Sequence, residues 1–223
     1  MKNVVKIPVN FDADKLLSEV KYLESVMGWL DHWNNDYHSG NWQSIPLYSV
    51  GGRCETASIR PGKGDYEPTP GLKKSTYLPR VINWFQCEKT RVRLMKLDSG
   101  AEIFEHRDPG FSWHKGKIRV HIPIKTNGEV SFIVESEEVR MAAGEVWYCD
   151  FSRPHRLKNS GDEPRIHLVI DLIVNDWVRS LFPRENIREL IWNWLFNNLN
   201  SSVFSHHPAF AGLRKTTRRL LNS

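Results

Sequence analysis

Apolar residues follow two different spacings along the chain. Between residues 12 and 33 they recur at steps of three and four, the spacing of an amphipathic helix, and Asp12 or Asp14 is placed to cap its N-terminus. The apolar positions of this helix are Leu16, Leu17, Val20, Leu23, Val26, Met27 and Leu30. Between residues 90 and 174 apolar and polar residues alternate in short runs, which predicts a series of strands.

The strand series is regular enough to predict an architecture. Turn signals such as Asp98-Ser99-Gly100 and Asn127-Gly128 separate the runs. The predicted strands are residues 91–96, 102–106, 117–124, 130–134, 146–149, 154–158 and 165–173. So many short strands in one stretch predict a jelly roll or a small barrel, and therefore a mainly β fold with flanking helices.

The remaining segments predict loops and helices around this core. Residues 34–79 are rich in Gly, Pro, Ser and Tyr and predict loops with a few short elements. Residues 78–86 predict a short helix opening at Pro79, and Asn175 is a candidate cap for a last helical region. Residues 187–199 have the pattern of an amphipathic helix that packs on a sheet or on a second subunit.

The length fits one domain with additions at both ends. The chain has 223 residues, of which 40% are hydrophobic and 26% charged, as is usual for globular proteins. We therefore expect an N-terminal helical and loop region (1–89), a β core (90–175) and a C-terminal helical region with a basic tail (176–223).

Charge and cysteine content bear on the partners that the protein can bind and on its location in the cell. The formal net charge is +5, and part of the excess lies at Arg214, Lys215, Arg218 and Arg219. Such a tail could favour nucleic acid or anionic lipid, but we interpret it as solvated, because no strand interleaves basic and aromatic residues. No apolar run is long enough to span a membrane, and the three cysteines lack metal-site spacing. We expect a cytoplasmic protein that binds neither nucleic acid nor membrane.

A candidate metal site lies within the strand series. His106 and Asp108 are two residues apart, so they share one face of an extended chain, and His155 comes from a later strand. Two imidazoles and one carboxylate form the facial triad of non-haem iron(II) oxygenases, which leaves positions open for a co-substrate and O₂. Taken alone, this pattern is also compatible with polar surface residues at a turn.

Two predicted strands carry a second set of polar residues. Arg165 and His167 alternate with apolar residues on one strand, and Arg119 and His121 do so on another. An arginine inside a barrel is costly unless it meets an anion, so two such arginines suggest a dicarboxylate ligand. The alternative is an outward-facing arginine or a structural ion pair with Asp171.

In this order and at this spacing, the motifs resemble a known family. The stretches are residues 97–108 (LDSGAEIFEHRD), 119–127 (RVHIPIKTN), 144–159 (GEVWYCDFSRPHRLKN) and 165–171 (RIHLVID). They resemble the aspartyl/asparaginyl β-hydroxylase family of iron(II)- and 2-oxoglutarate-dependent oxygenases, which includes bacterial cis-4-proline hydroxylases. The resemblance implies a double-stranded β-helix core, a cupin-like jelly roll, with Fe(II), 2-oxoglutarate and O₂ as cofactor and co-substrates.

The resemblance also implies roles for individual residues. His106 and His155 would bind iron, and Arg165 would hold the distal carboxylate of 2-oxoglutarate. Arg119 and His121 would lie beside the carboxylates of co-substrate and substrate. Asp150 and His167 would support these residues without binding the ligands themselves.

The chain departs from parts of the family at three places. It has Asp108 as a third metal ligand, as the bacterial amino-acid hydroxylases do and the animal members do not. Met95 stands where some members place a serine that helps to hold the co-substrate. The loop after Asp108 is long, and its Phe111, Trp113 and His114 are predicted either to form a substrate lid or to be an ordinary surface loop.

These observations predict a hydroxylase that acts on an unactivated C–H bond and releases succinate and CO₂. We expect its substrate to be a free amino acid or a compact amino-acid derivative. The alternatives are an Asp or Asn residue in a peptide or carrier-bound intermediate and a non-catalytic cupin-like binding protein. We also expect a homodimer through the C-terminal helix.

Overall fold

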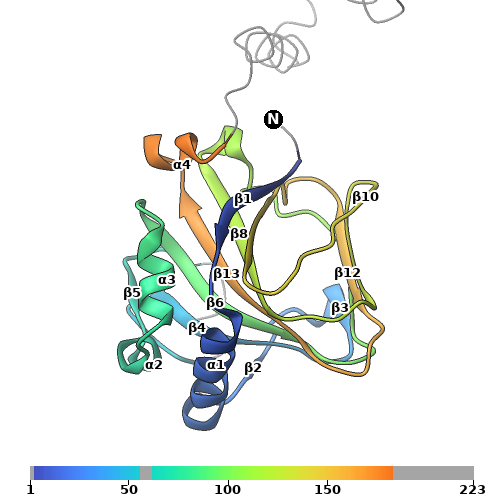
Figure 1. The fold of residues 1–223 in the computed structure, drawn as a ribbon, viewed down its shortest axis with the longest axis horizontal. Coiled ribbons are helices and arrows are strands. Elements are labelled where there is room, and N and C mark those ends of the chain that lie inside the picture. The colour runs from blue at the N-terminus through green and yellow to red at the C-terminus, as the bar shows by residue number, and fades with distance from the viewer. Residues whose placement is uncertain (1–2, 56–61, 183–223) are drawn as a thin grey trace, which may run out of the picture. The chain divides into compact units, whose positions relative to one another are not determined.

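Two antiparallel β-sheets pack against each other in the computed structural model, which describes residues 3–55 and 62–182 (Figure 1). The larger sheet has the strand order β1-β11-β8-β13-β6-β4-β2, with β5 paired to β4. The smaller sheet has the order β10-β9-β12-β7-β3. Apolar residues of both sheets, such as Val4, Leu97, Phe132 and Leu157, form one buried cluster between them. The predicted mainly β fold is confirmed.

The elements have the following bounds. The helices are α1 (Ala13–Met27), α2 (Pro70–Lys74), α3 (Leu78–Trp84) and α4 (Asp176–Ser180), with 3-10 turns η1 (Asn35–Tyr37) and η3 (Trp113–Lys115). The strands of the larger sheet are β1 (Val4–Asn10), β2 (Leu30–Asp31), β4 (Trp42–Val50), β5 (Tyr66–Pro68), β6 (Lys89–Leu97), β8 (Lys117–Lys125), β11 (Glu145–Cys149) and β13 (Arg165–Ile173). Those of the smaller sheet are β3 (His38–Ser39), β7 (Glu102–His106), β9 (Val130–Val134), β10 (Glu137–Glu138) and β12 (His155–Asn159).

All seven predicted strands are present, with boundaries that differ by at most two residues. Residues 34–79 were expected to form loops with a few short elements, but they contain the nine-residue strand β4. A further strand, β1, precedes α1, where no element was predicted. β1 and β4 are long strands of the larger sheet, and β4 lies directly beside β6. The first 89 residues therefore supply strands to the same sheet as the predicted core.

The helices cover the face of the larger sheet that points away from the smaller sheet (Figure 1). Asp12 caps α1 by accepting a hydrogen bond from the Lys15 amide, and Leu16, Val20 and Leu23 are buried. The helix ends at Gly28, whose φ of 69° suits a glycine, so it is shorter than the predicted span to residue 33. Pro79 opens α3, as predicted, and Asn175 caps α4.

Because helices cover one face and the smaller sheet covers the other, the central strands are buried on both sides. β13 is buried along its length except at Ile173. Its residues Arg165, His167 and Asp171 therefore point toward the interior between the sheets, and the alternate apolar residues point toward the helices. The predicted alternation thus places charged groups inside the roll.

The predictions for the C-terminal part concern residues outside those that the structure describes. They concern the helix at 187–199, the homodimer that it was expected to form and the basic tail. Within the described part of the chain, no helix is long and apolar enough to cross a membrane. Localisation in the cytoplasm and the absence of a nucleic-acid partner stay predictions.

Candidate metal and co-substrate site

His106 and His155 lie side by side on neighbouring strands of the smaller sheet. They are directly paired in the antiparallel register of β7 and β12, and their ring centroids are 4.2 Å apart. Asp108 follows β7 and is held in place by its amide, which donates to the Phe151 carbonyl at 2.8 Å. One ligand atom from each of the three residues lies within 4.8 Å of the others. The structure therefore brings the predicted triad together.

Backbone hydrogen bonds orient both imidazoles. Nδ1 of His106 lies 2.8 Å from the Phe104 carbonyl, and Nδ1 of His155 lies 3.0 Å from the Arg153 carbonyl. A carbonyl can only accept, so each Nδ1 carries the proton and each Nε2 keeps its lone pair for a metal. Burial lowers the pKa of His155 to about 4, which keeps its imidazole neutral and able to bind a metal at neutral pH.

Asp108 accepts from Arg119, whose Nη1 donates to its Oδ2. Burial alone would raise the pKa of Asp108, but the charge of Arg119 and the nearby His155 and His106 hold that pKa below its ordinary value. The carboxylate is therefore ionised at neutral pH. Since a carboxylate has two oxygens, Asp108 can accept from Arg119 and still offer an oxygen to a metal.

Arg165 is buried without a carboxylate partner. It is 4% exposed, and its Nη2 lies 2.8 Å from Nδ1 of His167, which must accept and is therefore neutral. Within residues 3–55 and 62–182, its Nε has no hydrogen-bond partner and it forms no ion pair. Burial lowers the pKa of Arg165 to about 9, because its charge is poorly solvated there. A buried cation in this state fits an anionic ligand.

His121 lies next to this pair. Its Nδ1 is 3.4 Å from Nδ1 of His167, and its ring stacks on Phe151 with centroids 5.0 Å apart. Nε2 of His121 is buried without a partner among the described residues. His121, His167 and Arg165 therefore form one polar group with unsatisfied hydrogen-bonding positions.

Arg119 belongs to a different cluster, centred on the fully buried Asp171. Arg119 Nε lies 2.7 Å from Asp171 Oδ1, and Arg91 Nη2 and Arg93 Nη1 each lie 3.2 Å from Asp171 Oδ2. Burial alone would raise the pKa of Asp171, but these three guanidinium groups hold it well below its usual range. Burial also lowers the pKa of Arg93 to about 9.

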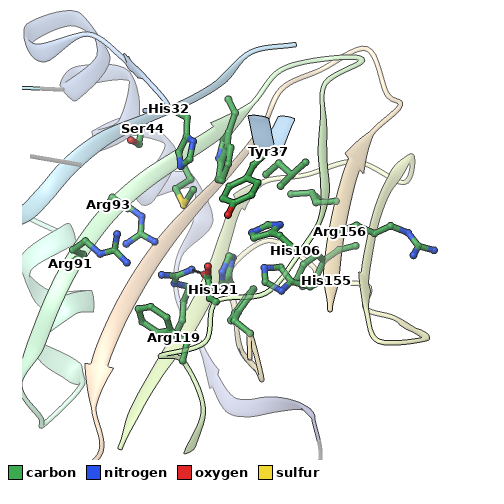
Figure 2. Close-up of a pocket in the computed structure, with 18 of the residues that line it drawn as sticks. His32, Tyr37, Ser44, Arg91, Arg93, His106, Arg119, His121, His155 and Arg156 are labelled. Carbon is green, nitrogen blue, oxygen red and sulfur yellow. Dashed lines mark hydrogen bonds and ion pairs between the residues drawn. The ribbon is translucent and has the colours of Figure 1, made fainter. Parts of the chain in front are cut away.

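The metal triad, Arg165, His121 and the three arginines around Asp171 line one cavity of about 290 Å³ between the two sheets. Figure 2 shows Arg91, Arg93 and Arg119 on one side of it and His106 and His155 on the other. An aromatic wall of Tyr37, His32 and Trp42 closes part of its rim. This last group comes from residues outside the predicted core and includes the stacked pair His32 and Trp42, whose centroids are 3.6 Å apart.

The three residues of the predicted lid lie in different surroundings. Phe111 lines the cavity, where its ring lies over the Arg119 guanidinium at 4.0 Å from the centroid. Trp113 and His114 do not line it. Trp113 packs on Phe182, with ring centroids 4.6 Å apart.

Asp150 and Met95 lie near the positions that the sequence predicted. Asp150 accepts from the amide and hydroxyl of Ser152 and so closes the turn that leads to His155. Met95 lines the cavity and pairs with Ser44 on β4. The buried Ser44 also lines the cavity, so a neighbouring strand supplies a hydroxyl beside the methionine.

Sequence reasoning missed Arg91 and Arg93, although their signal was present. They alternate with Val92 and Leu94 on β6, which is the same pattern that identified Arg119 and Arg165. It also missed Tyr37 and His32, for which no comparable periodicity exists, since Tyr37 ends the short turn η1 and His32 lies in the connection between β2 and η1.

Comparison with known proteins agrees with this geometry. The chain is 26% identical over 184 residues to L-proline cis-4-hydroxylase of Rhizobium meliloti (strain 1021), covering 82% of this chain and 63% of that protein. It is 25% identical over 173 residues to L-proline cis-3-hydroxylase 1 of a Streptomyces species, covering 74% of this chain and 58% of that protein. The chain thus spans about three fifths of the length of these curated relatives.

Solved structures show the same fold at low sequence identity. The non-haem α-ketoglutarate-dependent epimerase SnoN from nogalamycin biosynthesis matches with a TM-score of 0.53 and 11% identity, covering 77% of this chain and 76% of that one. A 2OG-Fe(II) oxygenase family oxidoreductase from Burkholderia pseudomallei matches with a TM-score of 0.50 and 15% identity, covering 76% and 85%. These likenesses support the double-stranded β-helix fold.

The family model described as aspartyl/asparaginyl beta-hydroxylase matches residues 11–174, a span that contains the triad, Arg165 and the arginines around Asp171. With more than half of the sequence matched and the family's polar residues gathered in one cavity, the chain belongs to the aspartyl/asparaginyl β-hydroxylase family.

Proposed function

We propose that this protein is an iron(II)- and 2-oxoglutarate-dependent hydroxylase of a free amino acid or a compact amino-acid derivative. The observation that carries the proposal is Arg165, a buried guanidinium without a carboxylate partner among the described residues. It lines the same cavity as His106, Asp108 and His155. A metal site and a buried anion site in one cavity suit a co-substrate that carries two carboxylates.

The donor set fits iron(II). Two neutral imidazoles with free Nε2 atoms and one ionised carboxylate match the facial arrangement that leaves coordination positions open. When bound, iron(II) with 2-oxoglutarate and O₂ would supply the oxidising power for C–H hydroxylation, with succinate and CO₂ as co-products. The protein's part is to orient the ligand imidazoles, keep Asp108 ionised and shape the cavity.

The anion site fits the distal carboxylate of 2-oxoglutarate. Arg165 offers unsatisfied N–H groups, and His167 holds one edge of its guanidinium. Ser44 contributes a hydroxyl to the same cavity. Phe132 and Phe151 line the space between this end and the metal ligands and exclude water from it.

The cavity favours a small substrate. Its volume of about 290 Å³ is at the low end for ligand sites, and it must also hold the co-substrate. Its remaining polar wall is cationic, which suits the carboxylate of an amino acid. Two relatives are named as hydroxylases of L-proline, a free amino acid, which supports the same substrate class.

The test is succinate release with iron(II), 2-oxoglutarate and a panel of free amino acids, with mass spectrometry for a product heavier by one oxygen. Arg165→Ala should raise the apparent constant for 2-oxoglutarate by a factor of roughly 30 or more, because a buried charge-assisted pair is worth about 2 to 5 kcal/mol. Lys158→Gln, at an exposed position of β12, is the matched control and should leave the constant unchanged.

Three results would contradict the proposal. An unchanged apparent constant for 2-oxoglutarate in Arg165→Ala would show that Arg165 does not bind the co-substrate. Succinate release stimulated only by short peptides that contain Asp or Asn would replace the free amino acid with a peptide as the substrate. Binding of 2-oxoglutarate without any turnover would favour a non-catalytic binding protein.

A further inference from the structure

The arginines around Asp171 outnumber the carboxylates that can neutralise them. Arg91, Arg93 and Arg119 are 7% to 8% exposed, and all three donate to or pair with Asp171. Within the described residues, their only other carboxylate partner is Asp108, through Arg119. Three buried cations therefore share two carboxylates, and one of those carboxylates belongs to the metal triad.

If Asp108 binds iron(II), as the proposed function requires, Asp171 is left as the main counter-charge for three guanidinium groups. The three guanidinium groups then carry two more positive charges than Asp171 can neutralise, in a buried site where uncompensated charge is costly. The carboxylate of an ordinary amino acid would neutralise one of them, provided that its ammonium group faces away from the arginines. A second anionic group on the substrate would neutralise the other.

Arg91 is the member of this cluster that is best placed to meet that second group. Arg119 already donates to both carboxylates through Nε, Nη1 and Nη2. Arg91 pairs with Asp171 only through Nη2, and its buried Nε has no partner among the described residues. It lines the cavity beside Phe111, whose ring centroid lies 5.8 Å from its guanidinium carbon. Figure 2 shows it extending from the same face of β6 as Arg93.

We propose that Arg91 binds a second anionic group of the substrate, so that the enzyme prefers an amino acid with a side-chain carboxylate over its neutral counterpart. The inference rests on the proposed function and specifies, in addition, that the preferred substrate carries a second negative charge. Asp171 holds the position of the Arg91 guanidinium, and Phe111 covers it from one side.

The first experiment compares acids with their isosteric amides. L-Glutamate is compared with L-glutamine, L-aspartate with L-asparagine, and L-proline serves as a monocarboxylic reference. Succinate release and hydroxylated product are measured at saturating 2-oxoglutarate, so that the acids do not compete at the Arg165 site. We expect at least one acid to exceed its amide about tenfold or more in kcat/KM.

The second experiment changes the charge of Arg91. Arg91→Met should lower kcat/KM for the preferred acid about 30-fold while changing that for its amide less than about threefold. Arg91→Lys should restore most of the acid preference. Arg80→Gln, which removes a charge from an exposed position on α3, is the control and should match the unaltered protein.

The outcomes separate the two claims. Turnover of proline or an amide in preference to every acid, or equal losses for acid and amide in Arg91→Met, overturns the role of Arg91 and leaves the hydroxylase standing. No succinate release with any amino acid overturns both. If circular dichroism shows that Arg91→Met is unfolded, the acid preference of the unaltered protein and of Arg91→Lys decides the question.

Discussion

At the level of single residues, Arg119 shows how a partner changes the role of a side chain. Its alternation with apolar residues on β8 predicted a buried cation beside the ligand carboxylates. In the structure its donor nitrogens are engaged by Asp171 and Asp108. The sequence predicted that Arg119 is buried and left an ion pair with Asp171 as an alternative, which the structure shows. The second partner, Asp108, was not predicted, because it lies in a loop on another segment of the chain.

This arrangement predicts that Arg119 supports the metal site through Asp108. Arg119→Met should weaken iron(II) binding about 10- to 100-fold, the usual effect of removing a group that orients a metal ligand. Arg119→Lys should lose less, because it keeps a cation near Asp108. Anaerobic titration with iron(II) measures the affinity, and thermal unfolding checks that Asp171 remains neutralised by Arg91 and Arg93. Unchanged affinity in Arg119→Met would show that Asp108 is oriented without it.

At the level of elements, two prolines explain why β1 and β4 escaped prediction. Proline cannot donate to a ladder, so a run that contains it is a weak strand signal. Pro8 lies in β1 where the pairing with β11 is irregular between Ile7 and Asn10. Pro46 lies in β4 at the irregularity before Tyr48. The missing N–H falls where the ladder is already interrupted, which a single sequence does not reveal.

The segment η1 and β3 adds an aromatic wall that the predicted core lacked. Tyr37 stacks on the metal ligand His106, with ring centroids 5.2 Å apart and an interplanar angle of 15°. β3 holds this segment in place by pairing with β7, the strand that ends at His106. The element therefore covers one face of a metal ligand and part of the cavity rim.

We expect Tyr37→Ala to raise the apparent constant for the amino-acid substrate about 2- to 10-fold, because an aromatic contact contributes about 0.5 to 1.5 kcal/mol. Tyr37→Phe should behave like the unaltered protein, since it keeps the stacked ring. Steady-state kinetics with varied amino acid measures the effect, and the constant for 2-oxoglutarate is the internal control. Equal effects of Ala and Phe would assign the role to the hydroxyl instead.

At the level of the whole molecule, residues far apart in sequence meet because two sheets close over one interior. Strand alternation predicted His106, His155, Arg165 and Arg119, since each lies on a predicted strand. It could not predict Ser44 or the rim aromatics, because their elements reach the cavity only through the topology of the sheets. Local pattern thus predicted which side chains point inward, and only the fold shows which of them meet.

The packing of the two sheets over one interior also buries several imidazoles in the neutral state. Burial lowers the pKa of His32 and of His155 to about 4, and it holds the pKa of His121 and His167 well below the ordinary value of 6.5. In the unfolded chain these groups titrate near 6.5. Between about pH 6.5 and pH 4 the unfolded state therefore binds more protons than the folded state, so the stability that these groups contribute is complete above pH 6.5 and is lost as the pH falls.

We therefore expect the free energy of unfolding of the metal-free protein to decrease steeply below pH 6.5. Each neutral buried imidazole contributes a slope of up to about 1.4 kcal/mol per pH unit, so the observed slope near pH 5.5 should exceed about 2 kcal/mol per pH unit. Urea unfolding in the presence of a chelator, at steps between pH 7.5 and pH 4.5, measures it. His167→Gln keeps an acceptor for Arg165 but cannot take up a proton. It should therefore reduce the slope by about the amount that one histidine contributes. A slope no greater than that of a single histidine in the unaltered protein would show that these imidazoles become protonated without unfolding.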